Sequence, residues 1–110
     1  MHNLSVCGIF KNETPYFAEW IEYHRLLGVE HFYLINNHAE LEEPLPAIQK
    51  YLDAGIATHI HFPETNAPQV PAYCAALRAF GAHTRWMAFI DLDEYIWIGP
   101  DDSLTRLLAD

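Results

Sequence analysis

The fold is decided at residues 86–94, Trp86-Met87-Ala88-Phe89-Ile90-Asp91-Leu92-Asp93-Glu94, where an uninterrupted apolar run ends in three carboxylates. A short, continuous apolar run is typical of a strand that is buried on both faces of a parallel sheet. Asp91 and Asp93 would leave this strand on the same side, because successive side chains of a strand point to opposite faces. The stretch therefore predicts a parallel sheet with an acidic site at the end of one strand.

Strand-like and helix-like patterns alternate before this stretch. Apolar runs predict strands at 4–10, 30–35 and 56–62, and apolar residues at helical spacing predict helices at about 14–27, from 44 or 46 to about 54, and at 69–80. Thr14 and Pro15 suit the start of the first helix, and a glycine suits the end of each helix. Three strand–helix units and a fourth strand predict an α/β fold with a mostly parallel sheet and helices on both faces.

The remaining patterns complete this outline. Residues 95–98 suit a further short strand, and Ser103 would cap a last helix at 104–109. The helix–strand links are short, so residues 1–110 are expected to contain no domain boundary. The third helix is expected to turn an apolar face to the sheet, made of Val70, Tyr73, Cys74, Leu77 and Phe80.

Composition and charge exclude several classes of protein. Apolar residues make up 51% of the chain, so a core can form, and no apolar run approaches the roughly 20 residues that span a bilayer. The N-terminus lacks a secretory pattern, and Cys7 and Cys74 are far apart, so both are expected to be buried thiols in the cytoplasm. The net charge of -9 excludes nucleic-acid binding by phosphate neutralisation. A phosphate ligand would need a cation or a local cluster of Lys, Arg and backbone N–H groups.

Polar residues follow three of the predicted strands, at the edge where parallel α/β sheets bind ligands. At ~5 Å and an effective dielectric near 20, two carboxylates repel each other by about 3–4 kcal/mol, and a divalent cation beside them reverses the sign. Mg²⁺ or Mn²⁺ prefers such oxygens and keeps positions free for phosphate. Asp91 and Asp93 are therefore a candidate metal site, the alternative being a solvated turn. The polar sets are Lys11, Asn12 and Glu13, then Asn36, Asn37 and His38, and finally Asp91, Asp93 and Glu94.

Histidines and aromatic residues offer weaker candidates. His59 and His61 share one face of the third strand, a spacing that suits zinc, but without a third ligand they are expected to face solvent. His24 lies on the apolar face of the first helix and is expected to be a hydrogen-bonded core histidine. A core role is likewise expected for the aromatic residues Trp20, Tyr23 and Trp86.

Several stretches together resemble one group of enzymes. They are Gly8-Ile9-Phe10-Lys11-Asn12-Glu13, Glu19-Trp20-Ile21-Glu22-Tyr23-His24, Leu27-Gly28-Val29, His31-Phe32-Tyr33-Leu34 and Asn36-Asn37. These stretches resemble the start of family 2-like and family 92-like glycosyltransferases, and residues 86–96 resemble their metal-binding segment. The resemblance implies a Rossmann-like three-layer sandwich named GT-A, of which residues 1–110 would be the N-terminal, nucleotide-sugar-binding half.

The resemblance also implies roles for individual residues. Asp91 and Asp93 would hold Mn²⁺ or Mg²⁺ and touch the donor. Asn36 stands where similar proteins carry an Asp, which puts the donor preference in doubt, and Glu94 is expected to orient a neighbour rather than act as the base. No catalytic base is identifiable. Further contacts to the nucleotide would come from Lys11, Asn12, Glu13, Asn36, Asn37 and Gln69.

The expected function is the metal-dependent transfer of a sugar from a nucleoside diphosphate sugar to an unknown carbohydrate, lipid or protein acceptor. The cation and Lys11 would stabilise the leaving diphosphate. The alternative is a truncated, non-catalytic module that binds a nucleotide or another protein, because the second half of such an enzyme is missing. The uncovered surfaces of a half-fold predict self-association into a homo-oligomer. The full-length protein would be cytoplasmic or peripheral to a membrane.

Overall fold

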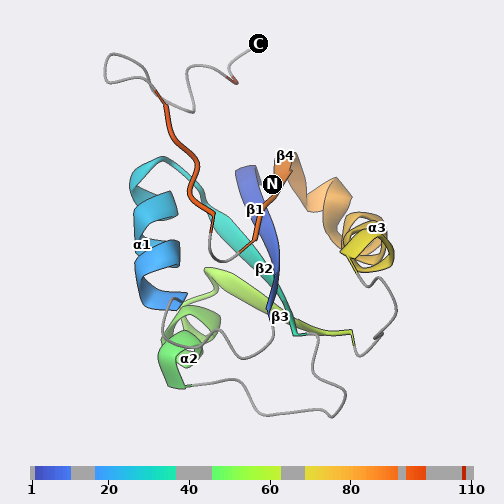
Figure 1. The fold of residues 1–110 in the computed structure, drawn as a ribbon, viewed down its shortest axis with the longest axis horizontal. Coiled ribbons are helices and arrows are strands. Elements are labelled where there is room, and N and C mark those ends of the chain that lie inside the picture. The colour runs from blue at the N-terminus through green and yellow to red at the C-terminus, as the bar shows by residue number, and fades with distance from the viewer. Residues whose placement is uncertain are drawn as a thin grey trace.

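The computed structural model describes residues 2–10, 17–36, 46–62, 69–91, 94–98 and 108, with only the backbone described for Pro46, Ala47, Gln69 and Val70. Its centre is a four-stranded sheet in the order β3-β2-β1-β4 (Figure 1). All three strand pairs are parallel. The strands are β1 (His2–Phe10), β2 (His31–Asn36), β3 (Ala57–His61) and β4 (Thr84–Phe89).

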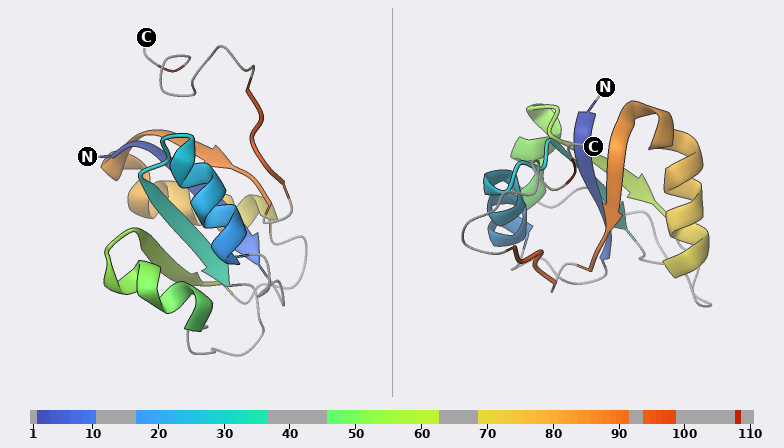
Figure 2. Two further views of the ribbon diagram at one scale, coloured as in Figure 1. Left: turned by 90° about the vertical axis from the view of Figure 1, so that its left-hand side faces the viewer. Right: turned by 90° about the horizontal axis from the view of Figure 1, so that it is seen from above.

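Helices cover both faces of this sheet. α1 (Phe17–Leu26) and α2 (Pro46–Asp53) lie on one face, and α3 (Gln69–Phe80) with the short 3-10 helix η2 (Gly81–His83) lies on the other (Figure 2). Gly28 and Gly55 follow the first two helices with φ of 105° and 75°, a conformation that glycine adopts without steric cost. The predicted α/β, Rossmann-like class and the order of strands and helices up to β4 are confirmed.

Alternating side chains of the strands build two apolar cores. Leu4, Val6 and Phe10 of β1 pack toward α1 and α2, whereas Cys7 packs toward α3. β2 lies between two strands, and all six of its residues are buried. This strand has the burial on both faces that the sequence pattern predicted for 86–90.

β4 instead lies at the edge of the described sheet, which corrects the prediction made for it. The strand pairs with β1, and Trp86 is 40% exposed. An apolar run indicates that both faces of a strand are apolar. It does not indicate whether the strand has one neighbour or two, because that depends on the order of strands in the sheet. The expectation that Trp86 is a core residue is wrong for the same reason.

The buried face of α3 is also rotated from the predicted one. Ala72 and Ala76 are buried against the sheet with Tyr73 and Phe80 beside them. Leu77 is 51% exposed, and Cys74 is exposed rather than buried. The small side chains of Ala72 and Ala76 therefore form the centre of the buried face, Tyr73 and Phe80 of the predicted face border it, and Cys74 and Leu77 turn outward.

Residues 94–98 do not form the predicted strand. They turn back from the end of β4 and run beside α1 (Figures 1 and 2). The predicted helix start at Thr14 and Pro15, the predicted cap Ser103 and, apart from Leu108, the last helix at 104–109 lie outside the described residues. No helix in the described ranges combines the length and apolar character that crossing a bilayer requires.

Candidate functional site

The carboxyl edge of the sheet brings together the ends of neighbouring strands. Phe10, Asn36 and His61 lie side by side in register at the ends of β1, β2 and β3. β4 ends opposite Cys7, and the Ile90 N–H continues the pairing by donating to the Cys7 carbonyl at 3.1 Å. Asp91 therefore leaves the sheet beside β1, on the opposite side of that strand from Asn36.

Both main-chain polar groups of Asp91 form hydrogen bonds with Glu94. Its N–H donates to Glu94 Oε1 at 2.8 Å, and its carbonyl accepts the Glu94 N–H at 3.0 Å. The carboxylate of Glu94 is thus engaged with the backbone of Asp91, as expected for a residue that orients its neighbour. These bonds confirm that Glu94 contacts and orients a neighbour, and the expectation that it is not the base stays a prediction.

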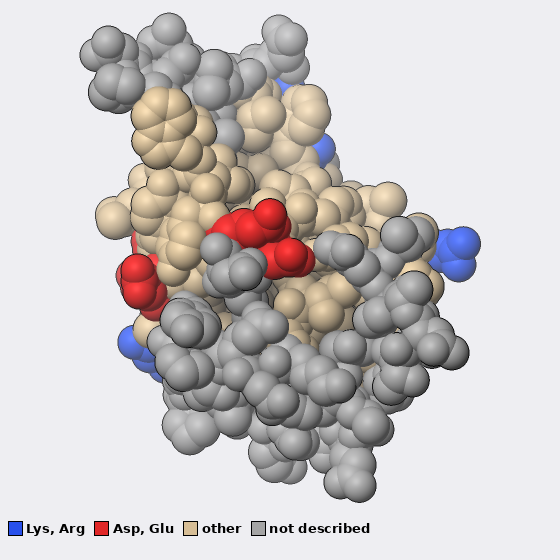
Figure 3. Space-filling model, viewed as in Figure 1, with Lys and Arg blue, Asp and Glu red and all other residues tan. Residues whose placement is uncertain are grey.

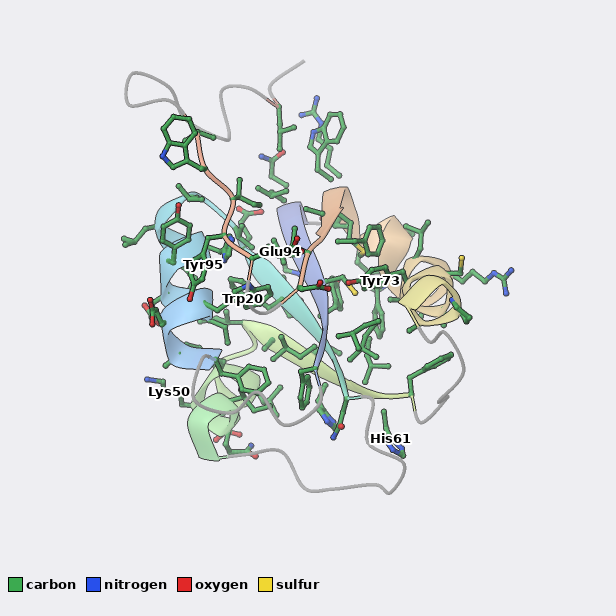
Figure 4. The ribbon with its side chains drawn as sticks, viewed as in Figure 1. Trp20, Lys50, His61, Tyr73, Glu94 and Tyr95 are labelled. Carbon is green, nitrogen blue, oxygen red and sulfur yellow. The ribbon has the colours of Figure 1, made fainter. Side chains whose placement is uncertain are left out.

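Trp20 binds the main chain of the same two residues, Asp91 and Glu94. Its indole N–H donates to the carbonyls of both Asp91 and Glu94, at 3.0 Å each, and its side chain is fully buried. Figure 4 shows Trp20 directly beside Glu94 in the middle of the molecule. Gly8 makes room for this arrangement, since a Cβ atom there would lie 2.9 Å from the Ile90 carbonyl oxygen and 3.4 Å from the Trp20 ring.

His24 and Tyr23 bind the segment further along. His24 is fully buried, its Nδ1 donates to the Trp20 carbonyl at 2.8 Å, and its Nε2 accepts the Ile96 N–H at 3.2 Å. This pairing requires a neutral imidazole, and burial lowers the pKa of His24 in agreement with it. The Tyr23 hydroxyl donates to the Ile96 carbonyl at 2.7 Å. The prediction of a hydrogen-bonded core histidine is confirmed, and Trp20, Tyr23 and His24 are called the α1 clamp below.

The α1 clamp was missed at the sequence level. Trp20 and His24 were expected in the core, but a partnership with residues more than 70 positions away was not predicted. The available signal was the spacing: residues at i, i+3 and i+4 share one side of a helix, and all three of these carry a polar atom on an aromatic ring.

Asn36 is oriented by the neighbouring strand. The residue is 2% exposed, and its Nδ2 lies 3.4 Å from His59 Nε2. Burial and then the nearby His61 lower the pKa of His59, so the ring is neutral and can accept from the amide. Both histidines are half-buried, which corrects the expectation that they face solvent.

Among the described residues, the acidic ones lie near the centre of the face that carries Glu94. Figure 3 shows acidic atoms in its middle, whereas the Lys and Arg atoms of the coloured residues lie at its margins. Two of the cations have partners elsewhere, since Arg25 pairs with Glu22 at 3.0 Å and Lys50 lies over the Tyr51 ring. A phosphate group at this face would meet the repulsion that the net charge predicted.

The other predicted site residues are placed only in part. Lys11, Asn12, Glu13, Asn37 and Asp93 lie outside the described residues, and Gln69 is described by its backbone alone, as the first residue of α3. The described ranges contain no group of three or more His, Cys, Asp or Glu side chains placed to bind a metal ion. The structure thus brings Asn36 and Asp91 to one edge, and the pairing of Asp91 with Asp93 stays a prediction.

Comparison with known proteins shows which family the chain belongs to. The model of glycosyltransferase family 92 matches residues 2–109. A glycosyltransferase family 92 protein of Ricinus communis is 31% identical over 86% of the chain, and others from Arabidopsis thaliana and Oryza sativa subsp. japonica are 28% and 27% identical over 87% and 97% of it. The chain spans 17%, 16% and 18% of the length of these three relatives. A match over nearly all of its residues shows that the chain belongs to glycosyltransferase family 92.

Proposed function

We propose that the chain is the nucleotide-sugar-binding part of a metal-dependent glycosyltransferase with the GT-A form of the Rossmann-like fold. The observation that carries this proposal is the position of Asp91 at the carboxyl edge of a parallel sheet, with its main chain held by Glu94 and Trp20. Ligands of such sheets bind at this edge. Membership of the family supports glycosyl transfer as the class of reaction.

The proposed metal ligands are Asp91 and Asp93. Carboxylate oxygens suit a hard divalent cation such as Mn²⁺ or Mg²⁺, and the acidic residues near the centre of the face that carries Glu94 would attract one. Glu94 is less suited as a ligand, because its Oε1 already accepts the Asp91 N–H. When bound, the cation would neutralise charge that develops on the departing diphosphate.

The nucleotide would lie across the ends of β1 and β2. We assign its contacts to Lys11, Asn12, Glu13, Asn37 and Gln69, in addition to Asp91, and Lys11 would add positive charge beside the diphosphate. Asn36 takes a supporting part in this proposal. At 2% exposure its amide offers little surface to a ligand, and its bond to His59 fixes the end of β2 instead.

Calorimetry tests the proposal. Uridine or guanosine diphosphate should bind the protein in the presence of Mn²⁺ and lose this binding when the metal is chelated. Asp91→Asn and Asp93→Asn should each abolish the metal-dependent part. Asp53→Asn is the matched control, because it removes one carboxylate that is exposed on α2 and bonded to Gln49. Equal binding with and without Mn²⁺ would contradict the proposal.

A second candidate is a nucleotide-binding or interaction module without catalysis. It is favoured by the fact that the chain spans less than a fifth of the length of its relatives, so the acceptor contacts and a base need not lie in it. Donor turnover separates the two. Release of the diphosphate from a bound sugar donor supports the enzyme, and binding without release supports the module.

A further inference from the structure

We propose that the α1 clamp is a set of positioning residues: it fixes the main chain at Asp91, Glu94 and Ile96, and thereby the direction in which Asp91 presents its carboxylate. This inference rests on the proposed function, because it assigns three residues of a helix to the support of the proposed metal site. None of the three residues is itself a proposed ligand.

The first argument comes from the backbone hydrogen bonds. Residues 94–98 have left the sheet, so no strand ladder satisfies their polar groups, and such groups need partners when they are shielded from water. The clamp provides several of them. Trp20 donates to the Asp91 and Glu94 carbonyls, and both backbone groups of Ile96 are bound by Tyr23 and His24. The path of the chain after β4 is therefore set by side chains of α1.

The second argument concerns rigidity. Trp20 and His24 are fully buried, and the Trp20 ring packs on those of Phe32 and His24 at centroid distances of 5.6 Å and 5.1 Å. Tyr95 closes the cluster by stacking on His24 at 5.7 Å and meeting Tyr23 edge-on at 5.0 Å (Figure 4). Side chains locked in this way hold the groups bound to them in one geometry.

The third argument separates positioning from simple packing. Core packing requires apolar area, which phenylalanine would supply at all three positions. Here the polar atoms of three aromatic side chains converge on the carbonyls of Asp91 and Glu94 and on the backbone of Ile96. Supporting residues of this kind typically change metal affinity by about 10–100-fold when they are removed.

Binding of Mn²⁺ alone, followed by electron paramagnetic resonance, tests the inference. Tyr23→Phe removes only the hydroxyl that binds Ile96, and Trp20→Phe removes the indole N–H. Tyr51→Phe is the matched control, because its hydroxyl donates to Glu22 Oε1 at 2.9 Å on α1, away from Asp91. The Mn²⁺ affinity should fall about tenfold or more in the first two variants, with an altered spectrum of the bound ion, and stay at the wild-type value in the control.

Thermal unfolding of each variant, measured in parallel, fixes a temperature at which all of them are folded. Equal Mn²⁺ affinity and an unchanged spectrum in Trp20→Phe and Tyr23→Phe would overturn the inference and leave the proposed function intact. An equal loss of affinity in Tyr51→Phe would also overturn it, because the effect would then follow general stability. If the wild-type protein binds no Mn²⁺, the proposed function fails first, and the inference fails with it.

Discussion

Replacement of Gly8 by alanine should disturb the candidate site from within the sheet. The added Cβ atom would lie 2.9 Å from the Ile90 carbonyl oxygen, a backbone atom directly before Asp91, and 3.4 Å from the Trp20 ring. Neither neighbour can turn away as a flexible side chain would, since the oxygen belongs to the main chain and Trp20 is fully buried. The strand must therefore separate locally from the residues that lead to Asp91.

The cost follows from this geometry. Overpacking of a well-packed core typically costs about 1–3 kcal/mol, and the smaller conformational freedom of alanine in the unfolded chain returns only about 0.4–1 kcal/mol. We expect Gly8→Ala to lower the free energy of unfolding by about 1–2 kcal/mol. For a domain of this size, that corresponds to a fall in melting temperature of roughly 4–12 °C.

Gly81→Ala provides the control for this experiment. Its Cβ atom would meet Leu77 Cδ1 at 3.1 Å, but Leu77 is a half-exposed side chain that can move. Urea unfolding of both variants should show a loss for Gly8→Ala and little change for Gly81→Ala. Equal stability of the two variants, with unchanged Mn²⁺ binding, would refute the argument that close contact at Gly8 sets the position of Ile90 and Asp91.

Two further predictions concern the pH dependence of stability and self-association. Burial, and then the neighbouring His2, lowers the pKa of His31 from 6.5 to about 4, and burial also lowers the pKa of His24. As the pH falls, the unfolded chain protonates these histidines at a higher pH than the folded protein does. The free energy of unfolding should therefore stay constant above pH 6.5 and decrease at lower pH, by about 3 kcal/mol at pH 4 for His31 alone. Urea unfolding from pH 8 to pH 4 should show this slope in the wild type and a shallower one in His31→Gln, and equal slopes would contradict it. Separately, β4 and its 40% exposed Trp86 should promote self-association of the protein. Light scattering should therefore show less self-association for Trp86→Lys than for the control Leu26→Lys. Leu26 is a suitable control because it is 88% exposed but lies at the end of α1. A wild-type monomer at every concentration would rule that surface out.

Local patterns predicted the elements and their order because they report local geometry. The apolar runs of β1 and β2, the helical spacing in α1 and the glycines at 28 and 55 depend on neighbours within a few residues. The core position of His24 was predictable for the same reason, since it follows from the apolar face of one helix. The stretches along the chain likewise indicated two glycosyltransferase families, of which family 92 is confirmed by the match over residues 2–109, whereas the likeness to family 2 stays a prediction.

The sequence by itself determined the α/β class, the succession of strands and helices and the edge of the sheet at which Asn36 and Asp91 lie. Only the tertiary structure decided that β4 lies at the edge of the described sheet, that α3 buries Ala72 and Ala76, and that α1 binds the chain after β4. Periodicity encodes which side of an element is apolar, whereas strand order and helix rotation depend on which distant surfaces pack together. The bonds from Trp20 to Asp91 span 71 residues, and no local pattern contains such a contact.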